Sequence, residues 1–321
     1  MSIIIVGIDI SKLKFDICFK DENGKTISKS FTNNQQGFKA LTEMLGEKAV
    51  CLGMEATGNY GYALAEYMHK LCYIVYVINP ALIKYYGKSL HYRVKTDKQD
   101  AKLIHGFMLA NKDSLHVWKP LSQGLQDLRA LNRCLENLKE EIVKFSNMAK
   151  SELNSKARKI YKSMLKKLEK KVESVSIEIR NIVDNNQDLK GTVSLLLTIP
   201  GVGEVTAWNL VSELPDFKDF KNAKQLAAYA GLNPSIRQSG TSVHSRGSVS
   251  KVGSARLRKA LYFPAMVALR YNPCVKILGA RLKVKGKNGK IIVVAAMHKL
   301  LRVIFAVLKK GEAFNFTENN G

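Results

Sequence analysis

Residues 3–20, IIIVGIDISKLKFDICFK, predict two β-strands joined by a short turn. Residues 3–9 form an apolar run, and residues 14–20 alternate apolar with polar side chains, which is typical of strands. The polar turn KDENG then leads into a third run with strand character, KTISKSF at residues 25–31. Because these runs are separated only by turns, we expect them to pair as an antiparallel meander.

In the next segment, runs with the apolar spacing of helices alternate with runs typical of strands, in the order helix, strand, helix, strand, helix. Pro80 ends the second of these strands, and the last helix begins at about Thr96. A meander followed by alternating units predicts an α/β mixed sheet with helices packed on its faces, as in the ribonuclease H-like (RuvC-like) fold. The runs cover residues 37–45, 49–55, 60–71, 73–79 and 96 onward.

Beyond residue 120 the pattern becomes helical, with leucines spaced by three and four. Two long amphipathic helices joined near residues 153–159 could form an antiparallel hairpin, dimerise as a coiled coil or belong to an ordinary core. The polar residues 183–191 have the composition of a linker. We therefore expect an α/β domain at 1–120, a helical coiled-coil region at 121–187 and a mainly α-helical C-terminal domain at 188–321.

The chain carries 51 Lys and Arg against 27 Asp and Glu, a formal net charge of +24. From Lys221 to the C-terminus the only acidic residues are Glu312 and Glu318. So strong an imbalance favours a polyanionic partner, since the charge otherwise produces only self-repulsion. Nucleic acid is the partner that this pattern predicts, with the C-terminal third lying along phosphates.

No membrane or export signal is expected. The N-terminus lacks a basic leader, and the apolar segment at residues 291–308 is interrupted by His298, Lys299 and Arg302, which favours a buried helix. The five cysteines include no C-x-x-C pair and lie among apolar residues, so we expect reduced, buried thiols and no zinc site. These features indicate a cytoplasmic, nucleoid-associated protein.

Four carboxylates occur where a sheet edge would gather them. Asp9 and Glu55 come at the ends of two predicted strands, and Asp97 and Asp100 share one face of a predicted helix that Thr96 could cap. Taken alone, acids at a helix start are more often a capping feature favoured by the helix dipole. Together the four acids predict a site for Mg²⁺, or Mn²⁺, of the type that carries out phosphoryl transfer.

The segment VGIDIS at residues 6–11 also resembles the first phosphate hairpin of actin-like ATPases and sugar kinases. Those proteins need a second phosphate loop of the D-x-G-G-T kind in a duplicated domain, and the sequence contains neither. It also contains no P-loop. We therefore expect no nucleotide cofactor.

Residues 197–214, LTIPGVGEVTAWNLVSEL, resemble a helix-hairpin-helix turn. Gly201 and Gly203 would let the backbone offer N–H groups to a phosphate without a Cβ atom in the way. A tight connection between two packed helices explains the same spacing equally well.

Residues 237–256, RQSGTSVHSRGSVSKVGSAR, have the composition of a mobile or ligand-ordered loop. A serine that attacks a phosphodiester needs a base or metal for its proton and cations for the charged transition state. Residue chemistry does not select one serine here. The cations that could serve it are Arg237, Arg246, Lys251 and Arg256.

Seven motifs in this order resemble the DEDD-type insertion-sequence transposases, the serine-dependent group also called bridge-RNA-guided recombinases. The resemblance spans nearly the whole chain, and the ordered set is more specific than any one motif. The motifs are GIDISKLKFD, MEATGNY, VINPAL, KTDKQDA, IPGVGEVTA, AAYAGLNPSIRQSG and LRKALYFPAMVA.

The resemblance implies a RuvC-like domain, a coiled coil and a C-terminal transposase domain. It implies that Asp9, Glu55, Asp97 and Asp100 hold Mg²⁺ and that Ser239 is the nucleophile that links to DNA. It further implies a homo-oligomer, a dimer or tetramer with composite sites, acting on element ends and target DNA with a structured guide RNA. Such a serine link would conserve the phosphodiester energy, so that no ATP is needed.

Two other functions remain open from the residues alone. The same four acids could serve a Holliday-junction resolvase or nuclease in which water is the nucleophile. A non-catalytic nucleic-acid-binding protein would also explain the charge. A DNA recombinase of the transposase type is the function that the motifs favour.

Overall fold

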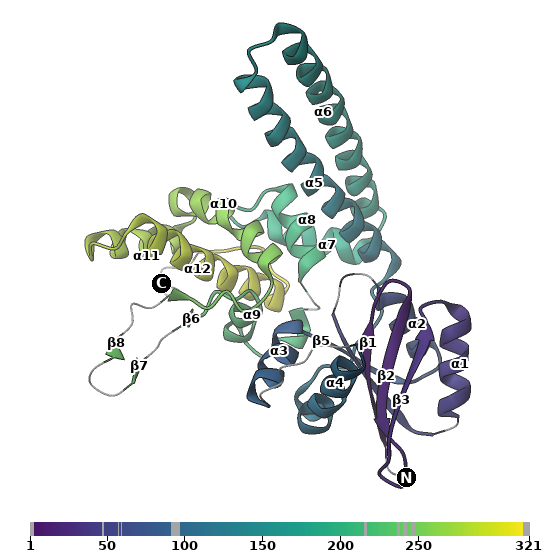
Figure 1. Cartoon of the computed structure of the whole chain (residues 1–321). Helices are drawn as coiled ribbons and strands as arrows, with labels where there is room; N and C mark the ends of the chain where they lie inside the picture. Colours follow the sequence, from purple (N-terminus) through teal and green to yellow (C-terminus); the bar gives the residue numbers. More distant parts are fainter. Residues whose placement is uncertain are drawn as a thin grey trace. The chain divides into compact units, whose positions relative to one another are not determined.

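The computed structural model divides the chain into two compact units, Met1–Leu121 and Ser122–Gly321, shown in Figure 1. Each unit has its own hydrophobic core, as the length and composition predict. The structure describes residues 3–46, 48–56, 58, 60–90, 97–214, 217–235, 238–239, 243–244 and 248–316.

The first unit is built on a five-stranded sheet in the order β3-β2-β1-β4-β5 among the described residues. The predicted meander is confirmed, because β2 pairs antiparallel with both β1 and β3. The two later strands run parallel to β1, as expected of strands separated by helices. The strands are β1 (Ile4–Ile10), β2 (Lys14–Lys20), β3 (Thr26–Thr32), β4 (Val50–Glu55) and β5 (Ile74–Ile78). The predicted mixed α/β sheet is therefore confirmed, and its assignment to the ribonuclease H-like fold stays a prediction.

Helices cover both faces of this sheet, as Figure 1 shows. Helices α1 (Gln35–Leu45) and α2 (Tyr62–Lys70) pack on one face, over Val6, Ile8 and the phenylalanines of β2. Helices α3 (Pro80–Ser89) and α4 (Asp97–Asn111) cover the other face, over Ile5 and Ile78. We call this second face the α4 face of the sheet.

Glycines allow α4 to lie directly on the sheet. A Cβ atom at Gly7 would come within 2.3 Å of the backbone nitrogen of His105 and 2.4 Å of the carbonyl oxygen of Ala101. Gly53, paired with Gly7 on the neighbouring strand, would meet the Met108 side chain at 2.5 Å. The helix backbone therefore touches the strand backbone, which a side chain at Gly7 would prevent.

Helix α3 is absent from the sequence interpretation, which used Pro80 only as the end of a strand. Proline also suits the first position of a helix, where its missing N–H has no partner to lose. Asn79 caps this helix by accepting a hydrogen bond from the amide of Ala81 at 2.9 Å. The Asn-Pro pair thus ends β5 and begins α3.

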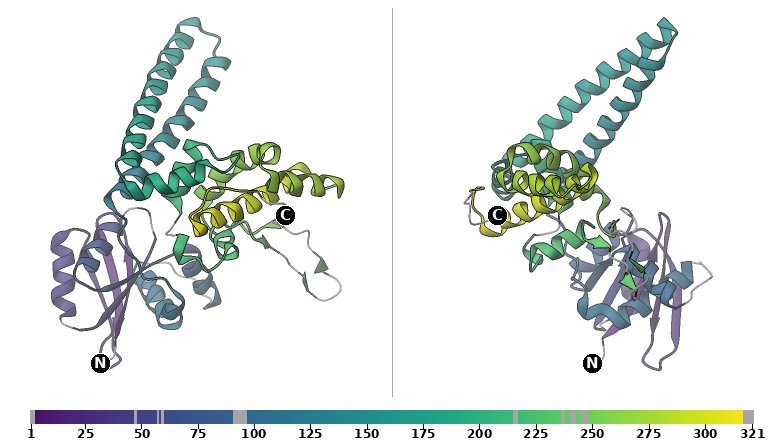
Figure 2. Two further views of the ribbon diagram at one scale, coloured as in Figure 1. Left: turned by 180° about the vertical axis from the view of Figure 1, so that it is seen from behind. Right: turned by 90° about the vertical axis from the view of Figure 1, so that its left-hand side faces the viewer.

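The second unit begins with two long antiparallel helices that extend from its body, α5 (Gln123–Ser151) and α6 (Ser155–Asp184). The views in Figures 1 and 2 agree that they lie side by side. The predicted hairpin and its connection near residues 153–159 are confirmed, whereas a coiled coil between chains stays a prediction. Asn154 caps α6 at the turn, accepting from the amides of Lys156 and Ala157.

The predicted linker at residues 183–191 is wrong. Helix α6 ends at Asp184 and α7 (Gln187–Leu197) begins after only two intervening residues, capped by Asn186, which accepts from the amide of Leu189. The polar residues of this stretch serve as helix ends and caps, which have the same composition as a linker.

The rest of the second unit is a helical core. Helix α12 (Gly289–Lys310) is long and apolar enough to cross a membrane, the one such helix in the described part of the chain. Nine of its residues are buried in the core of the unit, as the sequence predicted. The remaining helices are α8 (Glu204–Glu213), α9 (Ala223–Tyr229), α10 (Ala255–Tyr271), α11 (Pro273–Val284) and α12 (Gly289–Lys310).

The cysteine prediction holds in part. Cys18, Cys51 and Cys274 are buried thiols, but Cys72 and Cys134 are exposed. Cys72 lies in the turn after α2 with a positive φ of 65°, and Cys134 lies on the outer surface of α5. Apolar neighbours in sequence therefore did not predict burial at a turn or on an outer helix face.

The contact of α4 with β1 predicts that Gly7→Ala is strongly destabilising. The added methyl meets backbone on two sides, so α4 has to move, at a cost of roughly 1 to 3 kcal/mol. Gly106→Ala is the matched control on α4, because its methyl meets only the end of the Tyr86 side chain at 3.3 Å. Calorimetric unfolding should show a transition temperature below that of the wild type for Gly7→Ala but not for Gly106→Ala. Equal stability of the two variants would contradict this packing.

Candidate active site

The strand register places three carboxylates in one row across the α4 face. Asp9 of β1 pairs directly with Asp16 of β2. On the other side of β1, Ile8 pairs with Met54 of β4, so the next residues along these two strands, Asp9 and Glu55, lie beside each other. Asp9 lies two residues beyond Gly7, and Glu55 two beyond Gly53, so both share the face that α4 covers. The predicted meeting of Asp9 and Glu55 at the strand ends follows directly from this register.

Helix α4 adds the remaining two acids, because Asp97 and Asp100 lie in its first turn. The pKa of Asp9 is raised to about 6, first by burial and then by the negative charges of Asp100, Asp97, Glu55 and Asp16. Five carboxylates from three strands and one helix therefore act on one another electrostatically. Thr96, the predicted cap of this helix, lies outside the described residues.

Asp16 is the acid that sequence reasoning missed. Its side chain is only 4% exposed, and it accepts a hydrogen bond from the hydroxyl of Ser30, its cross-strand partner on β3. The signal was present, since Asp16 is the charged residue within the otherwise apolar interior of β2. A buried carboxylate in a strand needs partners, which places it beside other functional groups.

Lys14 brings a positive charge into this group of acids. Its ammonium lies 2.8 Å from Oδ2 of Asp97 and 3.3 Å from Oδ2 of Asp16, and these hydrogen bonds raise its pKa. The side chains of Lys14 and Asp97 are each about half exposed, at 50% and 55%. The same network therefore holds a buried acid of β2 and an exposed acid of α4.

The donor set suits a hard divalent ion. All five groups are carboxylates, whose oxygens are the ligands that such ions prefer, and burial followed by the neighbouring acids raises the pKa of Asp9. Within the described ranges, no three His, Cys, Asp or Glu side chains converge tightly enough to form a ready cluster for a metal. Mutual repulsion, together with the Lys14 contact of Asp97, is a physical reason for their separation.

The two glycines of the predicted helix-hairpin-helix turn differ in their surroundings. Gly201 has a φ of 102° and packs against α10, where a Cβ atom would come within 3.0 Å of Ala268 and of the Pro264 carbonyl. Gly203 begins α8 and faces open space. Packing thus accounts for glycine at 201, and a contact with phosphate stays a prediction for both positions.

The serine-rich segment forms short antiparallel pairs where it is described. Ser239 lies on β7 (Gln238–Ser239), opposite Val243 on β8 (Val243–His244). β6 (Pro234–Ser235) pairs with β9 (Ser248–Val249), and Figure 1 shows β6 closer to the helices than β7 and β8. The sequence predicted an unpacked loop and did not anticipate these strand pairs.

Two of the four predicted cations of this segment can be placed. Lys251 is exposed at a positive φ of 55°, and Arg256 on α10 forms an ion pair with Glu136 of α5 at 3.6 Å. Arg256 therefore has a partner within its own unit. Arg237 and Arg246 lie outside the described residues.

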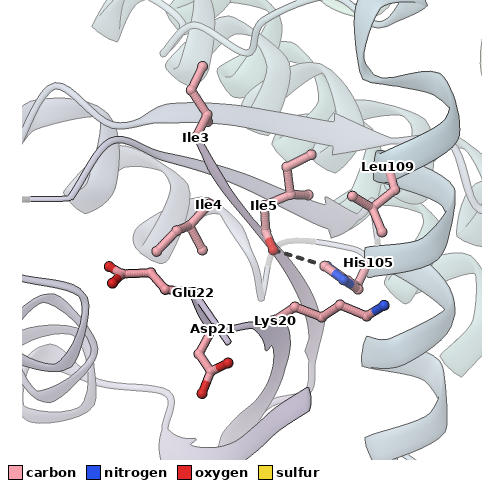
Figure 3. Close-up of a pocket in the computed structure, with 8 residues that line it drawn as sticks. All are labelled: Ile3, Ile4, Ile5, Lys20, Asp21, Glu22, His105 and Leu109. Carbon is pink, nitrogen blue, oxygen red and sulfur yellow. Dashed lines mark hydrogen bonds between the residues drawn. The ribbon is translucent and has the colours of Figure 1, made fainter. Parts of the chain in front are cut away.

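A pocket at the other end of β1 is separate from the acids. Figure 3 shows His105 of α4 in this pocket, where its Nδ1 contacts the carbonyl oxygen of Ile5 at 3.0 Å. Burial lowers the pKa of this imidazole, so it fastens α4 to β1 as a neutral group. His105 therefore helps to position the helix that carries Asp97 and Asp100.

Comparison with known proteins gives concordant matches over both units. Residues 193–278 match the family described as the IS116/IS110/IS902 transposases, and residues 6–156 match the DEDD transposases of IS110 type. The chain is 34% identical to the pilin gene-inverting protein of Moraxella bovis, over 98% of each chain. It is 26% identical to the transposase of element IS1328 from Yersinia enterocolitica, over 98% of this chain and 99% of that protein.

The raised pKa of Asp9 predicts that Asp9→Asn stabilises the metal-free protein at neutral pH. A carboxyl with a higher pKa in the folded than in the unfolded chain makes the protein less stable as pH rises from about 4 through 6. Because Asp9 is only half-buried, we expect a gain on the order of 1 kcal/mol at pH 7 and none near pH 4.

Calorimetry in EDTA at several pH values measures this difference. Asp113→Asn is the control, because Asp113 lies past the opposite end of α4 and its substitution changes the net charge equally. A gain for Asp9→Asn that is independent of pH, or one shared by the control, would argue against crowding of the acids.

Proposed function

This chain belongs to the IS110/IS116 family of DEDD transposases, which are DNA-cutting and rejoining enzymes, and we propose that it recombines DNA through a covalent link to Ser239. In this proposal Asp9, Glu55, Asp97 and Asp100 hold a divalent metal, Mg²⁺ or Mn²⁺, and a structured RNA guides the choice of DNA sites. The observation that carries the proposal is the gathering of Glu55, Asp97 and Asp100 around Asp9, which the strand register and the first turn of α4 produce.

The acid site supports the metal part of the proposal through its chemistry. Oxygen-only ligands favour Mg²⁺ or Mn²⁺ over zinc, and the strand ends leave the acids partly exposed, where a DNA backbone can approach. A bound divalent ion would supply charge neutralisation for the phosphoryl group. The ribonuclease H-like assignment is consistent with the observed strand order, in which β4 and β5 extend the meander on the β1 side.

The proposed strand transfer balances without an external energy source. The Ser239 hydroxyl oxygen forms a bond to phosphorus, one P–O bond of the DNA strand breaks, and the released strand hydroxyl takes a proton. A hydroxyl of another DNA strand then attacks the phosphoserine, and the serine regains its proton. Each step exchanges one phosphodiester for another, so the number of high-energy bonds does not change.

The second unit supports the nucleic-acid part of the proposal. The scarcity of acids after Lys221 leaves it strongly basic, and such a surface binds phosphates without reading base sequence. A protein that binds phosphates in this way can leave the recognition of the DNA sequence to a guide RNA. This proposal includes the predicted nucleic-acid contacts, which are made by Gly201, Gly203, Arg237, Arg246, Lys251 and Arg256. It also includes a homo-oligomer joined through the α5–α6 hairpin.

The serine step predicts that Ser239→Ala abolishes the protein–DNA adduct. Purified protein is incubated with its element-end DNA and Mg²⁺, denatured, and examined for DNA that migrates with protein. Ser250→Ala is the control, since Ser250 belongs to the same segment and its backbone amide donates to the Asn233 carbonyl, a bond that the substitution keeps. Normal DNA cleavage by Ser239→Ala would favour the nuclease alternative, in which water is the nucleophile.

The metal site predicts that activity is lost on chelation and restored by excess Mg²⁺ or Mn²⁺. Asp100→Asn should lower recombination at least about a hundredfold at saturating metal, because a charged ligand is replaced by a neutral one. Recombination of a marked element in cells and strand cleavage in vitro measure the loss. Full activity of Asp100→Asn would contradict its assignment as a ligand.

A further inference from the structure

Lys14 is held in place on the α4 face by a buried anchor. It lies two residues from Asp16 on β2, so their side chains point to the same side of the sheet. Asp16 is itself fixed by the Ser30 hydroxyl, and its carboxylate lies 3.3 Å from the Lys14 ammonium. The ammonium is therefore positioned by β2 and β3, independently of α4.

The same ammonium lies 2.8 Å from Asp97, at the start of α4. A positive charge thus already occupies the side of Asp97 that faces β2, where it lowers the repulsion between Asp97 and the other acids. Asp97 is about half exposed, so its side chain has room to change rotamer. A divalent ion and Lys14 would compete for this carboxylate, because both are cations that need the same oxygens.

We propose that Lys14 is a built-in counter-ion that competes with divalent metal for Asp97, so that Asp97 must leave Lys14 before the metal site is complete. This inference rests on the proposed function, in which Asp97 is a metal ligand. Lys14 keeps its Asp16 contact when Asp97 leaves, so the ammonium stays beside the site. As a consequence, the site binds metal more weakly than the same acids would without Lys14. In return, the carboxylates repel one another less when metal is absent.

The test compares metal affinity in the absence of DNA. Lys14→Met removes the charge but keeps a side chain of similar length, and Mn²⁺ titration followed by electron paramagnetic resonance measures binding to the full-length protein. Because exposed ion pairs are weak, we expect an affinity for Mn²⁺ about threefold to tenfold higher than that of the wild type. In EDTA the same variant should unfold at a temperature a few degrees lower, and Mn²⁺ should remove that difference.

Two variants control for charge and for folding. Lys14→Arg keeps the positive charge and should bind Mn²⁺ as the wild type does. Lys29→Met removes the same charge from β3 on the opposite face, where Lys29 lies 5.4 Å from the Phe31 ring, and should leave the affinity unchanged. An equal gain in affinity for Lys29→Met would overturn the proposal, because it would show only an effect of net charge.

The outcomes separate this inference from the proposed function. If the wild type binds Mn²⁺ and Lys14→Met binds no more tightly, the competition is disproved and the metal site remains. If Lys14→Met lowers the unfolding temperature equally with and without Mn²⁺ at unchanged affinity, Lys14 is only a structural ion pair. If neither the wild type nor Lys14→Met binds Mn²⁺, both the metal site and the competition are disproved.

Discussion

The close approach of α4 to β1 at Gly7 is the constraint on which the acid site depends. Helix and strand backbones touch there, and the His105 imidazole fastens the helix to the Ile5 carbonyl. Since a helix is rigid over its first turns, this contact also determines how far Asp97 and Asp100 lie from Asp9. A single residue separates the packing glycine from the carboxylate on the strand, so packing and chemistry share one face of the sheet.

The second constraint is electrostatic. Burial and four neighbouring carboxylates raise the pKa of Asp9, which means that its ionised carboxylate opposes folding. Lys14 reduces this repulsion at Asp97 and Asp16 without filling the site. Functional sites commonly retain such unfavourable charge, because the charge is what binds the missing partner. In the proposed function, the basic second unit binds a different partner, the phosphates of nucleic acid.

Much of the first unit could be predicted from local pattern. Alternation in residues 14–20 and the apolar run at 3–9 identified β1 and β2, and the chain order of Asp9, Glu55, Asp97 and Asp100 identified the acids. Helix α3 was missed because proline signals both the end of a strand and the beginning of a helix. The stretch at 183–191 was misread because linkers and helix caps use the same polar residues.

By itself the sequence determined the α/β sheet, the two long helices and the family motifs, and it predicted four acids for the site, because these depend on periodicity and on chain order. Only the tertiary structure revealed Asp16 as a fifth carboxylate and Lys14 as its partner. Their roles depend on which residues lie opposite each other across strands and on which helix covers them. Such pairings join positions as distant as Lys14 and Asp97, and no local pattern in the chain encodes the distance between two side chains that far apart.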